Sequence, residues 1–121
     1  MTYDDKNIFA KILRGEIPCK KIYEDEYVLS FYDINPQKKI HALVIPKGKY
    51  IDLDDFNSNA SNDEIVGLMK GITKVSKKLG ISSIDGKGYR ALANISDYGG
   101  QEVPHLHFHL FGGEKIGKMV S

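Results

Sequence analysis

Apolar residues recur at helical spacing in two parts of the chain. The first part is a short predicted helix over residues 8 to about 14, which Asn7 can cap and Gly15 can end. The second is the main helix, about 18 residues long, which follows Ser61 and ends at Gly80. Ser61 has a glutamate three positions later, and this capping-box pattern marks where the main helix begins.

Five shorter runs carry the apolar, aromatic and β-branched residues that favour strands. They are residues 20–24, 27–33, 41–47, 89–94 and 105–111. The segment 52–60 is polar and loop-like, with room for one helical turn. Because strands and helices do not alternate regularly, we expect an α+β fold in a single domain, residues 1–121. It combines a mainly antiparallel five-stranded sheet with one short N-terminal helix and one long helix.

Three of the four histidines fall on alternate residues of the last predicted strand, at His105, His107 and His109. Alternate side chains of a strand point to the same face, so the pattern predicts a row of imidazoles opposite a face of leucine and phenylalanine. Histidine is only intermediate in its tendency to be buried. Catalysis and metal binding both have a use for such a row.

Composition narrows the possible partners and compartments. A length of 121 residues suits one domain, and 41% hydrophobic residues are enough for a core. The net charge is +1 and the basic residues are scattered, which argues against a nucleic-acid or membrane surface as partner. The single cysteine, Cys19, excludes an internal disulfide, and its place after Pro18 in a polar connection suits a non-catalytic thiol. The polar N-terminus and the absence of an apolar run of ~20 residues favour the cytoplasm.

The histidine row suggests phosphorus chemistry. Successive rings lie roughly 6.5–7 Å apart along a strand, so one small reacting centre cannot lie equally close to all three. His107, in the middle, has a histidine on each side that can orient it, and neutral imidazole is a good nucleophile near neutral pH. In the preceding loop, the Gly99–Gly100 turn can direct backbone N–H groups at an anion. We therefore predict that His107 attacks phosphorus.

Residues 99–113, Gly-Gly-Gln-Glu-Val-Pro-His-Leu-His-Phe-His-Leu-Phe-Gly-Gly, resemble the signature of the histidine triad (HIT) superfamily, in its Hint branch of purine nucleoside phosphoramidases. Three further landmarks match in order, at residues 7–18, 31–36 and 41–47, so the resemblance covers nearly the whole chain. It implies a HIT-like fold and hydrolysis of the P–N bond of an AMP or GMP phosphoramidate. The reaction would pass through a nucleotidyl-histidine intermediate and need no cofactor.

The resemblance also implies a role for each histidine. His107 would be the nucleophile. His109 would contact phosphate and handle the proton of the leaving group. His105 and His41 would form a supporting hydrogen-bonded network behind the nucleophile. His41, at the start of a buried strand, equally suits a purely structural role.

Further residues would bind the nucleotide. By resemblance they are Asn94, Gly100, Gln101, Glu102 and Val103 for the phosphate, Asp33 for the ribose hydroxyls, and Ile8, Phe9, Ile17, Phe31 and Ile34 for the base. Structural interpretations stay open for some of them. Asp33, two residues before Asn35-Pro36, also suits turn initiation, and the apolar side chains also suit a core.

Three positions depart from common family patterns. Many bacterial relatives carry a zinc-binding Cys-x-x-Cys near the first helix, where this chain has Asn7 and Ala10, so we expect no metal site there. Glu102 stands where some relatives have serine, which leaves its backbone N–H for phosphate. The tail after Gly113 is shorter than in relatives whose tail helps to select the substrate.

Other functions stay open at this stage. The triad could ligate a catalytic metal, as three histidines hold zinc, although rings at alternate positions of a flat strand do not converge easily on one ion. A dinucleoside polyphosphate hydrolase of the same superfamily would share the triad, and a non-catalytic nucleotide-binding scaffold would also fit.

The resemblance further implies a homodimer in which the sheets of two subunits join. Candidate contacts are the predicted strand 89–94 and the main helix at Gly67 and Gly71. Each of these glycines costs the helix up to ~1 kcal/mol relative to alanine, so each either permits close packing or is merely tolerated.

Overall fold

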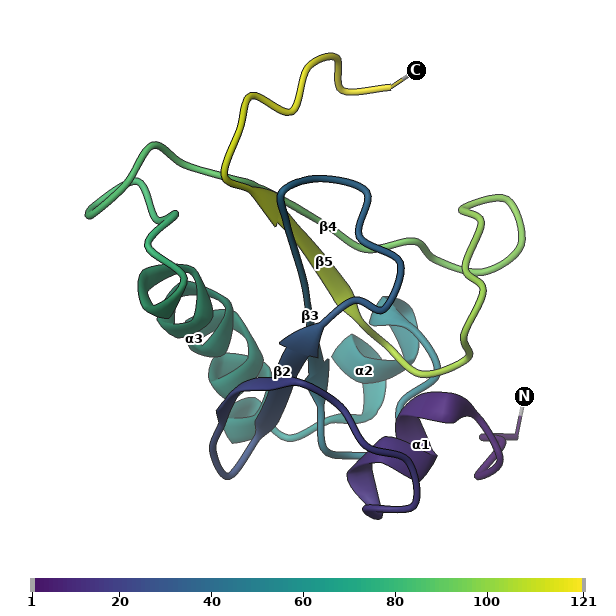
Figure 1. Ribbon diagram of the computed structural model, residues 1–121. Coiled ribbons are helices and arrows are strands. Elements are labelled where there is room, and N and C mark those ends of the chain that lie inside the picture. The colour runs from purple at the N-terminus through teal and green to yellow at the C-terminus, as the bar shows by residue number, and fades with distance from the viewer. Residues whose placement is uncertain (1, 121) are drawn as a thin grey trace.

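A five-stranded antiparallel sheet forms the centre of the molecule (Figure 1). The computed structural model describes residues 2–120. In spatial order the strands are β1 (Lys21–Glu24), β2 (Val28–Tyr32), β3 (Ile40–Pro46), β5 (Phe108–Gly112) and β4 (Arg90–Leu92). All four neighbouring pairs are antiparallel. The predicted α+β fold with a mainly antiparallel sheet is confirmed.

Three helices accompany the sheet: α1 (Ile8–Leu13), α2 (Leu53–Asn59) and α3 (Asn62–Lys78). The predicted caps are present, with the Asn7 side chain accepting from a backbone N–H of α1 and a complete capping box at Ser61. Helix α2 is longer than the single turn expected there, because Asp52 caps it and Phe56 buries its ring in the core. Within residues 2–120, no helix has both the length and the apolar composition needed to cross a bilayer.

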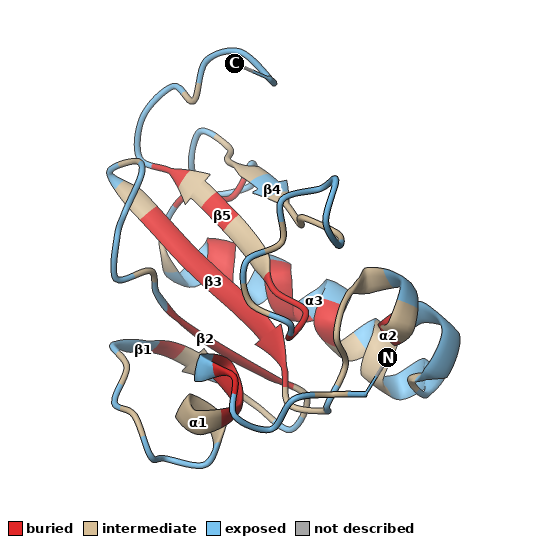
Figure 2. Cartoon of the chain, turned by 90° about the vertical axis from the view of Figure 1, so that its right-hand side faces the viewer, coloured by how far each residue is buried: buried red, intermediate tan, exposed pale blue. Residues whose placement is uncertain are grey.

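Strand β3 is buried on both of its faces (Figure 2). Ala42 and Val44 pack with α3 in the larger hydrophobic cluster, while Leu43 and Ile45 pack with Phe9 of α1 in the smaller one. Alternation along an extended chain therefore places α3 on one side of the sheet and α1 on the other. His41 belongs to the α1 side.

The regular strand β5 begins at Phe108, three residues later than predicted. Pairing with β3 reaches only Val44 opposite Phe108, and β3 itself ends at Pro46, which has no N–H to donate. The side-chain alternation nevertheless continues back from β5, because Leu106 packs in the α3-side cluster while His107 contacts Phe9 on the other side. The predicted strand 89–94 is similarly shortened, to β4.

Two glycines of α3 let the helix approach β2 closely. A Cβ at Gly67 would lie 2.5–2.7 Å from Tyr27, and one at Gly71 would lie 3.0 Å from Val28. Close packing is thus confirmed, but its partner lies within the chain. The glycine positions of α3 are occupied within the chain, and an intersubunit contact through another face of this helix stays a prediction.

Replacing Gly67 by alanine is expected to lower the free energy of unfolding by about 1–3 kcal/mol, because the new methyl group would clash with the base of the Tyr27 side chain. This cost exceeds the gain in helix propensity of ~1 kcal/mol. Urea denaturation of both proteins measures the difference. In a Tyr27→Ala background, where only the Cβ contact at 2.7 Å remains, the same Gly67→Ala change should cost less, and a stabilising effect in the parent protein would contradict the close packing.

Candidate active site

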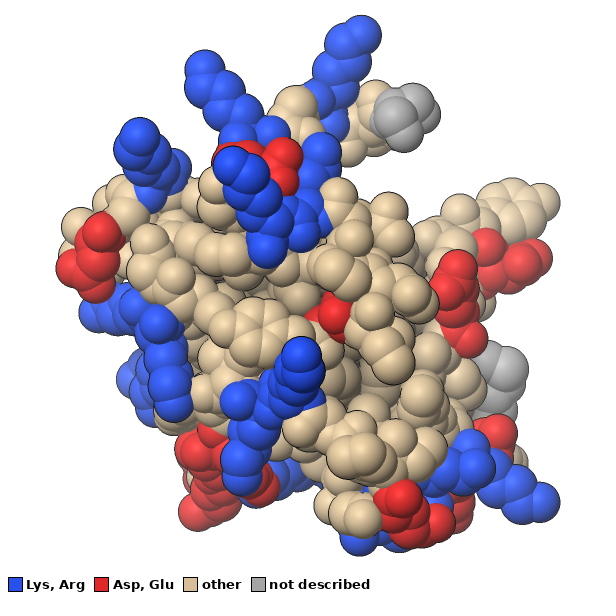
Figure 3. Space-filling view, in the orientation of Figure 1, with Lys and Arg blue, Asp and Glu red and all other residues tan. Residues whose placement is uncertain are grey.

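A pocket of about 510 Å³ opens on the α1 side of the sheet. Its lining comes from α1, the loop after β2, strands β3, β4 and β5, and the loop between β4 and β5. The lining residues are Phe9, Asp33, Asn35, Gln37, His41, Leu43, Leu92, Asn94, Gly100, Glu102, Val103, His107, His109 and Phe111. Charged side chains lie mainly around the edges of the face shown in Figure 3, with lysines and arginines projecting at its top.

A second hollow, of about 560 Å³, lies along the β1–β2 hairpin. Three of its charged groups pair with one another, since Glu24 forms ion pairs with Lys21 at 2.9 Å and Lys47 at 2.7 Å. None of its lining residues is a histidine or cysteine. The hollow on the α1 side is therefore the one that carries chemistry.

Several lining residues escaped the sequence analysis: Asn35, Gln37, Leu43, Leu92 and Phe111. Two of them carried a usable signal. Leu43 lies two residues after His41, and Phe111 two residues after His109, so strand alternation puts each on the histidine face. The pairing register then sets Leu43 opposite His109 and His41 opposite Phe111. Leu92 ends β4 opposite His109, and the positions of Asn35 and Gln37 depend on how the loop after β2 folds over the sheet.

Six predicted site residues do not line the pocket: Ile8, Ile17, Phe31, Ile34, Gln101 and His105. Phe31 is buried against Phe9, with 5.7 Å between ring centroids, and Ile34 is 90% exposed. Base contact by Ile8, Ile17, Phe31 and Ile34 stays a prediction.

A hydrogen bond to a backbone carbonyl holds His107 in one tautomer. Its Nδ1 lies 2.7 Å from the carbonyl oxygen of His105. A carbonyl only accepts hydrogen bonds, so Nδ1 carries the proton and Nε2 keeps its lone pair. The ring is buried in the pocket wall and packs edge-on against Phe9. The result is an unprotonated nitrogen on an oriented imidazole.

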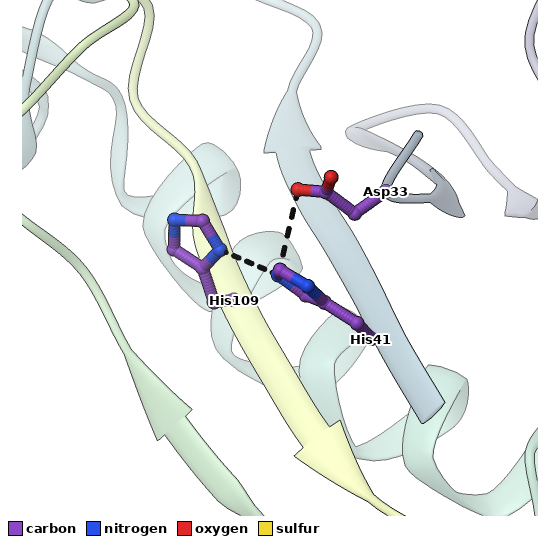
Figure 4. Close-up of side chains that lie close together, drawn as sticks. All are labelled: Asp33, His41 and His109. Atoms are coloured by element: carbon purple, nitrogen blue, oxygen red, sulfur yellow. Dashed lines mark hydrogen bonds and ion pairs between the residues drawn. The ribbon is translucent and has the colours of Figure 1, made fainter. Parts of the chain in front are cut away.

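A second hydrogen-bonded chain fixes His41 and His109. The backbone N–H of Gln37 donates to Nδ1 of His41 at 3.1 Å, so the proton of a neutral His41 is on Nε2. That nitrogen lies 2.9 Å from Nδ1 of His109 and donates to it (Figure 4). The proton of His109 is consequently on Nε2. His41 therefore orients His109, whereas the His105 carbonyl orients His107.

Asp33 makes the turn contact that the sequence allowed and also lines the pocket, while its contact with the ribose hydroxyls stays a prediction. Its Oδ1 accepts from the backbone N–H of Asn35 at 2.8 Å, which is a turn-initiating contact. Its Oδ2 lies 3.4 Å from Nε2 of His41, as Figure 4 shows. The carboxylate therefore organises the loop after β2 and also faces the histidine pair.

All four imidazoles are neutral near pH 7. Burial lowers the pKa of each below the ordinary value of 6.5, because the charged form loses hydration. The pKa of His105 falls to about 4, and so does that of His109, where the neighbouring His107 and His41 add to the effect of burial. Asp33 opposes these shifts at the three pocket histidines without cancelling them.

The side chain of Gln101 holds the loop before the triad together and does not point into the pocket. The Gln101 amide donates to the carbonyls of Ile51 at 2.6 Å and Val103 at 3.0 Å. The backbone N–H groups of Gly100 and Gln101 donate within the loop. The expectation that the Gly-Gly turn directs N–H groups at an anion is thus not met at Gly100. Among residues 2–120, the N–H groups of Glu102 and Val103 have no protein partner, and both residues line the pocket.

Three donor atoms in the pocket lie close enough to share a metal ion. They belong to Asp33, His41 and His109, and all lie within 4.8 Å of one another. The triad does not form this set, because both nitrogens of His105 bond to protein groups behind the pocket. An ion at Asp33, His41 and His109 would have to displace the proton shared by the two rings.

Comparison with known proteins identifies the family. Residues 14–116 match the family model of the HIT domain, and the chain belongs to this family, within a superfamily of hydrolases and nucleotidyl transferases. A HIT-like protein of Azospirillum brasilense is 51% identical over 99% of this chain and 96% of its own length. The purine nucleoside phosphoramidase of Escherichia coli is 37% identical over 97% of this chain and 95% of its own length.

Solved structures of HIT proteins share the fold of this chain. A HIT family hydrolase from Clostridium thermocellum superposes with a TM-score of 0.85 at 37% identity, covering 98% of this chain and 99% of that one. A histidine triad protein from Clostridium difficile gives a TM-score of 0.84 at 38% identity, over 97% and 98% of the two chains. The HIT-like fold predicted from the sequence is confirmed.

The neutral histidines make stability depend on pH. Between about pH 4 and 6.5 the unfolded chain binds more protons than the folded one, so the free energy of unfolding should fall as the pH drops through this range. Urea denaturation at pH 7.5, 6.0 and 5.0 measures the slope. Replacing His109 by glutamine should make the slope shallower, and a stability that is constant from pH 7.5 to 5.0 would contradict neutral buried histidines.

Proposed function

We propose that this protein hydrolyses the P–N bond of purine nucleoside phosphoramidates through a nucleotidyl intermediate on His107. The observation that carries the proposal is the hydrogen bond from His107 Nδ1 to the His105 carbonyl, which leaves Nε2 unprotonated in the pocket wall. Neutral imidazole with a free lone pair is a competent nucleophile toward phosphorus. The name of the 37% identical Escherichia coli relative, a purine nucleoside phosphoramidase, supports the substrate class.

In the first step, Nε2 of His107 attacks the α-phosphorus and the P–N bond breaks. The nucleotidyl-histidine that forms keeps its Nδ1 proton and is cationic, so the hydrogen bond to the His105 carbonyl strengthens. This bond is stronger in the intermediate than in the free enzyme, which is the condition for lowering the barrier. The N–H groups of Glu102 and Val103 are the candidate donors to the phosphoryl oxygens.

The departing amine needs one proton. We assign this proton to the His41–His109 pair, which takes it up as the anionic substrate binds, since a nearby negative charge favours the protonated form. Asp33 faces the pair and balances its charge. His109 then receives a proton from the water that attacks the intermediate. The nucleoside monophosphate leaves and His107 regains its lone pair.

Substrate turnover and trapping test the proposal together. The protein should release AMP from an adenosine phosphoramidate, and His107→Ala should lose at least ~10⁴-fold in kcat/KM, because no other group forms the intermediate. Acid-free quenching followed by mass spectrometry should find one nucleotidyl group on the parent protein, on the peptide that contains His107. Retained AMP binding by the variant controls for folding.

The same assay separates the rival functions. A dinucleoside polyphosphate cleaved faster than every phosphoramidate would move the substrate assignment to that class. Loss of activity after chelation, restored by a stoichiometric ion, would favour a metal enzyme at the Asp33, His41 and His109 cluster. Tight AMP binding with no turnover of any phosphoramidate would leave a nucleotide-binding scaffold.

The proton role of His109 predicts a dependence on the leaving group. With His109→Gln, kcat for a phosphoramidate should fall by about 10²–10⁴-fold, since the amine leaves without a donor. A nucleotide ester of p-nitrophenol should lose far less activity, because this phenol departs as a stable anion. Equal losses on the two substrates would show that His109 binds phosphate and does not deliver the proton.

We also propose that the protein is a homodimer joined along β4. This strand pairs with β5 on one side, and within residues 2–120 its other edge has no strand partner. An unpaired edge is a template for pairing with a second chain. Such a contact would join the two sheets without using the glycine face of α3.

A further inference from the structure

The carbonyl that orients His107 is not held by the regular sheet. Strand β5 begins only at Phe108, so His105 lies outside the β3–β5 ladder. Pro46, at the end of β3, cannot donate a ladder hydrogen bond. Outside the ladder, two backbone hydrogen bonds hold this part of the chain. The His105 N–H donates to the Val103 carbonyl at 2.9 Å, and the Leu106 N–H, in the same peptide group as the His105 carbonyl, donates to the Tyr50 carbonyl at 2.9 Å.

The side chain of His105 adds a further attachment for residue 105. Its ring is completely buried, and its Nε2 lies 2.9 Å from the carbonyl oxygen of Pro46. Because a carbonyl only accepts, Nε2 carries the proton and donates, which extends the attachment to β3 one step beyond the ladder. Nδ1 of His105 is then an acceptor, and it lies 2.6 Å from the Tyr3 hydroxyl. Both nitrogens of the ring are thus tethered.

Tyr3 is held in place by the segment in front of α1. Asp5 forms an ion pair with Lys49, in the connection that follows β3, at 2.9 Å, and its carbonyl accepts from the Arg14 guanidinium at 2.9 Å. The side chain of Asn7 donates to the carbonyl of Asp4 at 2.7 Å. The Tyr3 ring meets the His105 ring edge-on, with centroids 5.6 Å apart.

We propose that Tyr3 is a positioning residue for the nucleophile. Its hydroxyl donates to His105 Nδ1, which fixes the His105 ring in the tautomer that bonds to Pro46. The anchored ring holds the His105 carbonyl where it accepts the Nδ1 proton of His107. Together with the Leu106–Tyr50 backbone bond, an N-terminal residue outside the pocket thereby holds the carbonyl that sets the tautomer of the reacting ring. The expected effect on kcat rests on the proposed function. The expected effect on the His107 tautomer rests on geometry alone.

Three variants test it. Tyr3→Phe keeps the ring contact and removes only the hydroxyl, and Tyr3→Ala removes both. Tyr23→Phe is the matched control. It also removes a partly buried phenol hydroxyl, since Tyr23 lies in β1 and its hydroxyl donates to Asp25 at 2.8 Å. Nitrogen-15 NMR of the histidine rings reports the His107 tautomer in the free protein. Steady-state kinetics on an adenosine phosphoramidate report kcat and KM.

In Tyr3→Phe we expect a mixture of His107 tautomers and a decrease in kcat of about 10-fold with little change in KM. Tyr3→Ala should show the same kcat decrease, and Tyr23→Phe should match the parent protein in both measurements. A Tyr3→Phe protein with the parent tautomer would overturn the proposal, even with a reduced kcat, since the loss would then be structural. A parent protein inactive toward phosphoramidates would overturn the proposed function, and the tautomer comparison would still decide the role of Tyr3.

Discussion

The hydrogen bond between His107 Nδ1 and the carbonyl of His105 is the interaction on which the site depends. It connects residues two apart in the chain, yet it determines which nitrogen of the ring carries the proton. The same bond is available to the free imidazole and to the cationic intermediate of the proposed reaction, and it is stronger in the latter. This contact between residues two apart is thus also the source of the selective stabilisation that the proposed catalysis requires.

The pocket keeps its histidines neutral by burial and keeps them ordered by giving at least one nitrogen of each ring a defined hydrogen-bond partner. Burial alone would leave imidazoles free to change tautomer, and hydrogen bonds alone would not prevent protonation. The pair of His41 and His109 combines both effects, with Asp33 near enough to balance a proton when one arrives. In the proposed reaction, the anionic substrate would supply the opposite charge that favours this proton.

Strand β3 contributes side chains both to the hydrophobic core and to the histidine pocket. One set of its alternate side chains packs against α3, and the other set begins at His41 in the pocket and continues into the cluster around Phe9. A strand buried on both faces cannot shift its register without exposing apolar side chains, so the position of His41 opposite β5 is fixed by the core itself. The site is therefore placed by a strand that is buried on both faces.

The sequence by itself determined the caps of α1 and α3, the five strands and the alternation that sets His107 and His109 on one face, because these depend on neighbouring residues and on a two-residue or 3.6-residue period. It also carried the family signature. Only the tertiary structure decided that α2 is a helix, that β5 begins at Phe108, and that Gly67 accommodates Tyr27 of the same chain. It alone paired His41 with His109 and Tyr3 with His105, since partners 68 and 102 residues apart are chosen by how the sheet and the N-terminal segment pack.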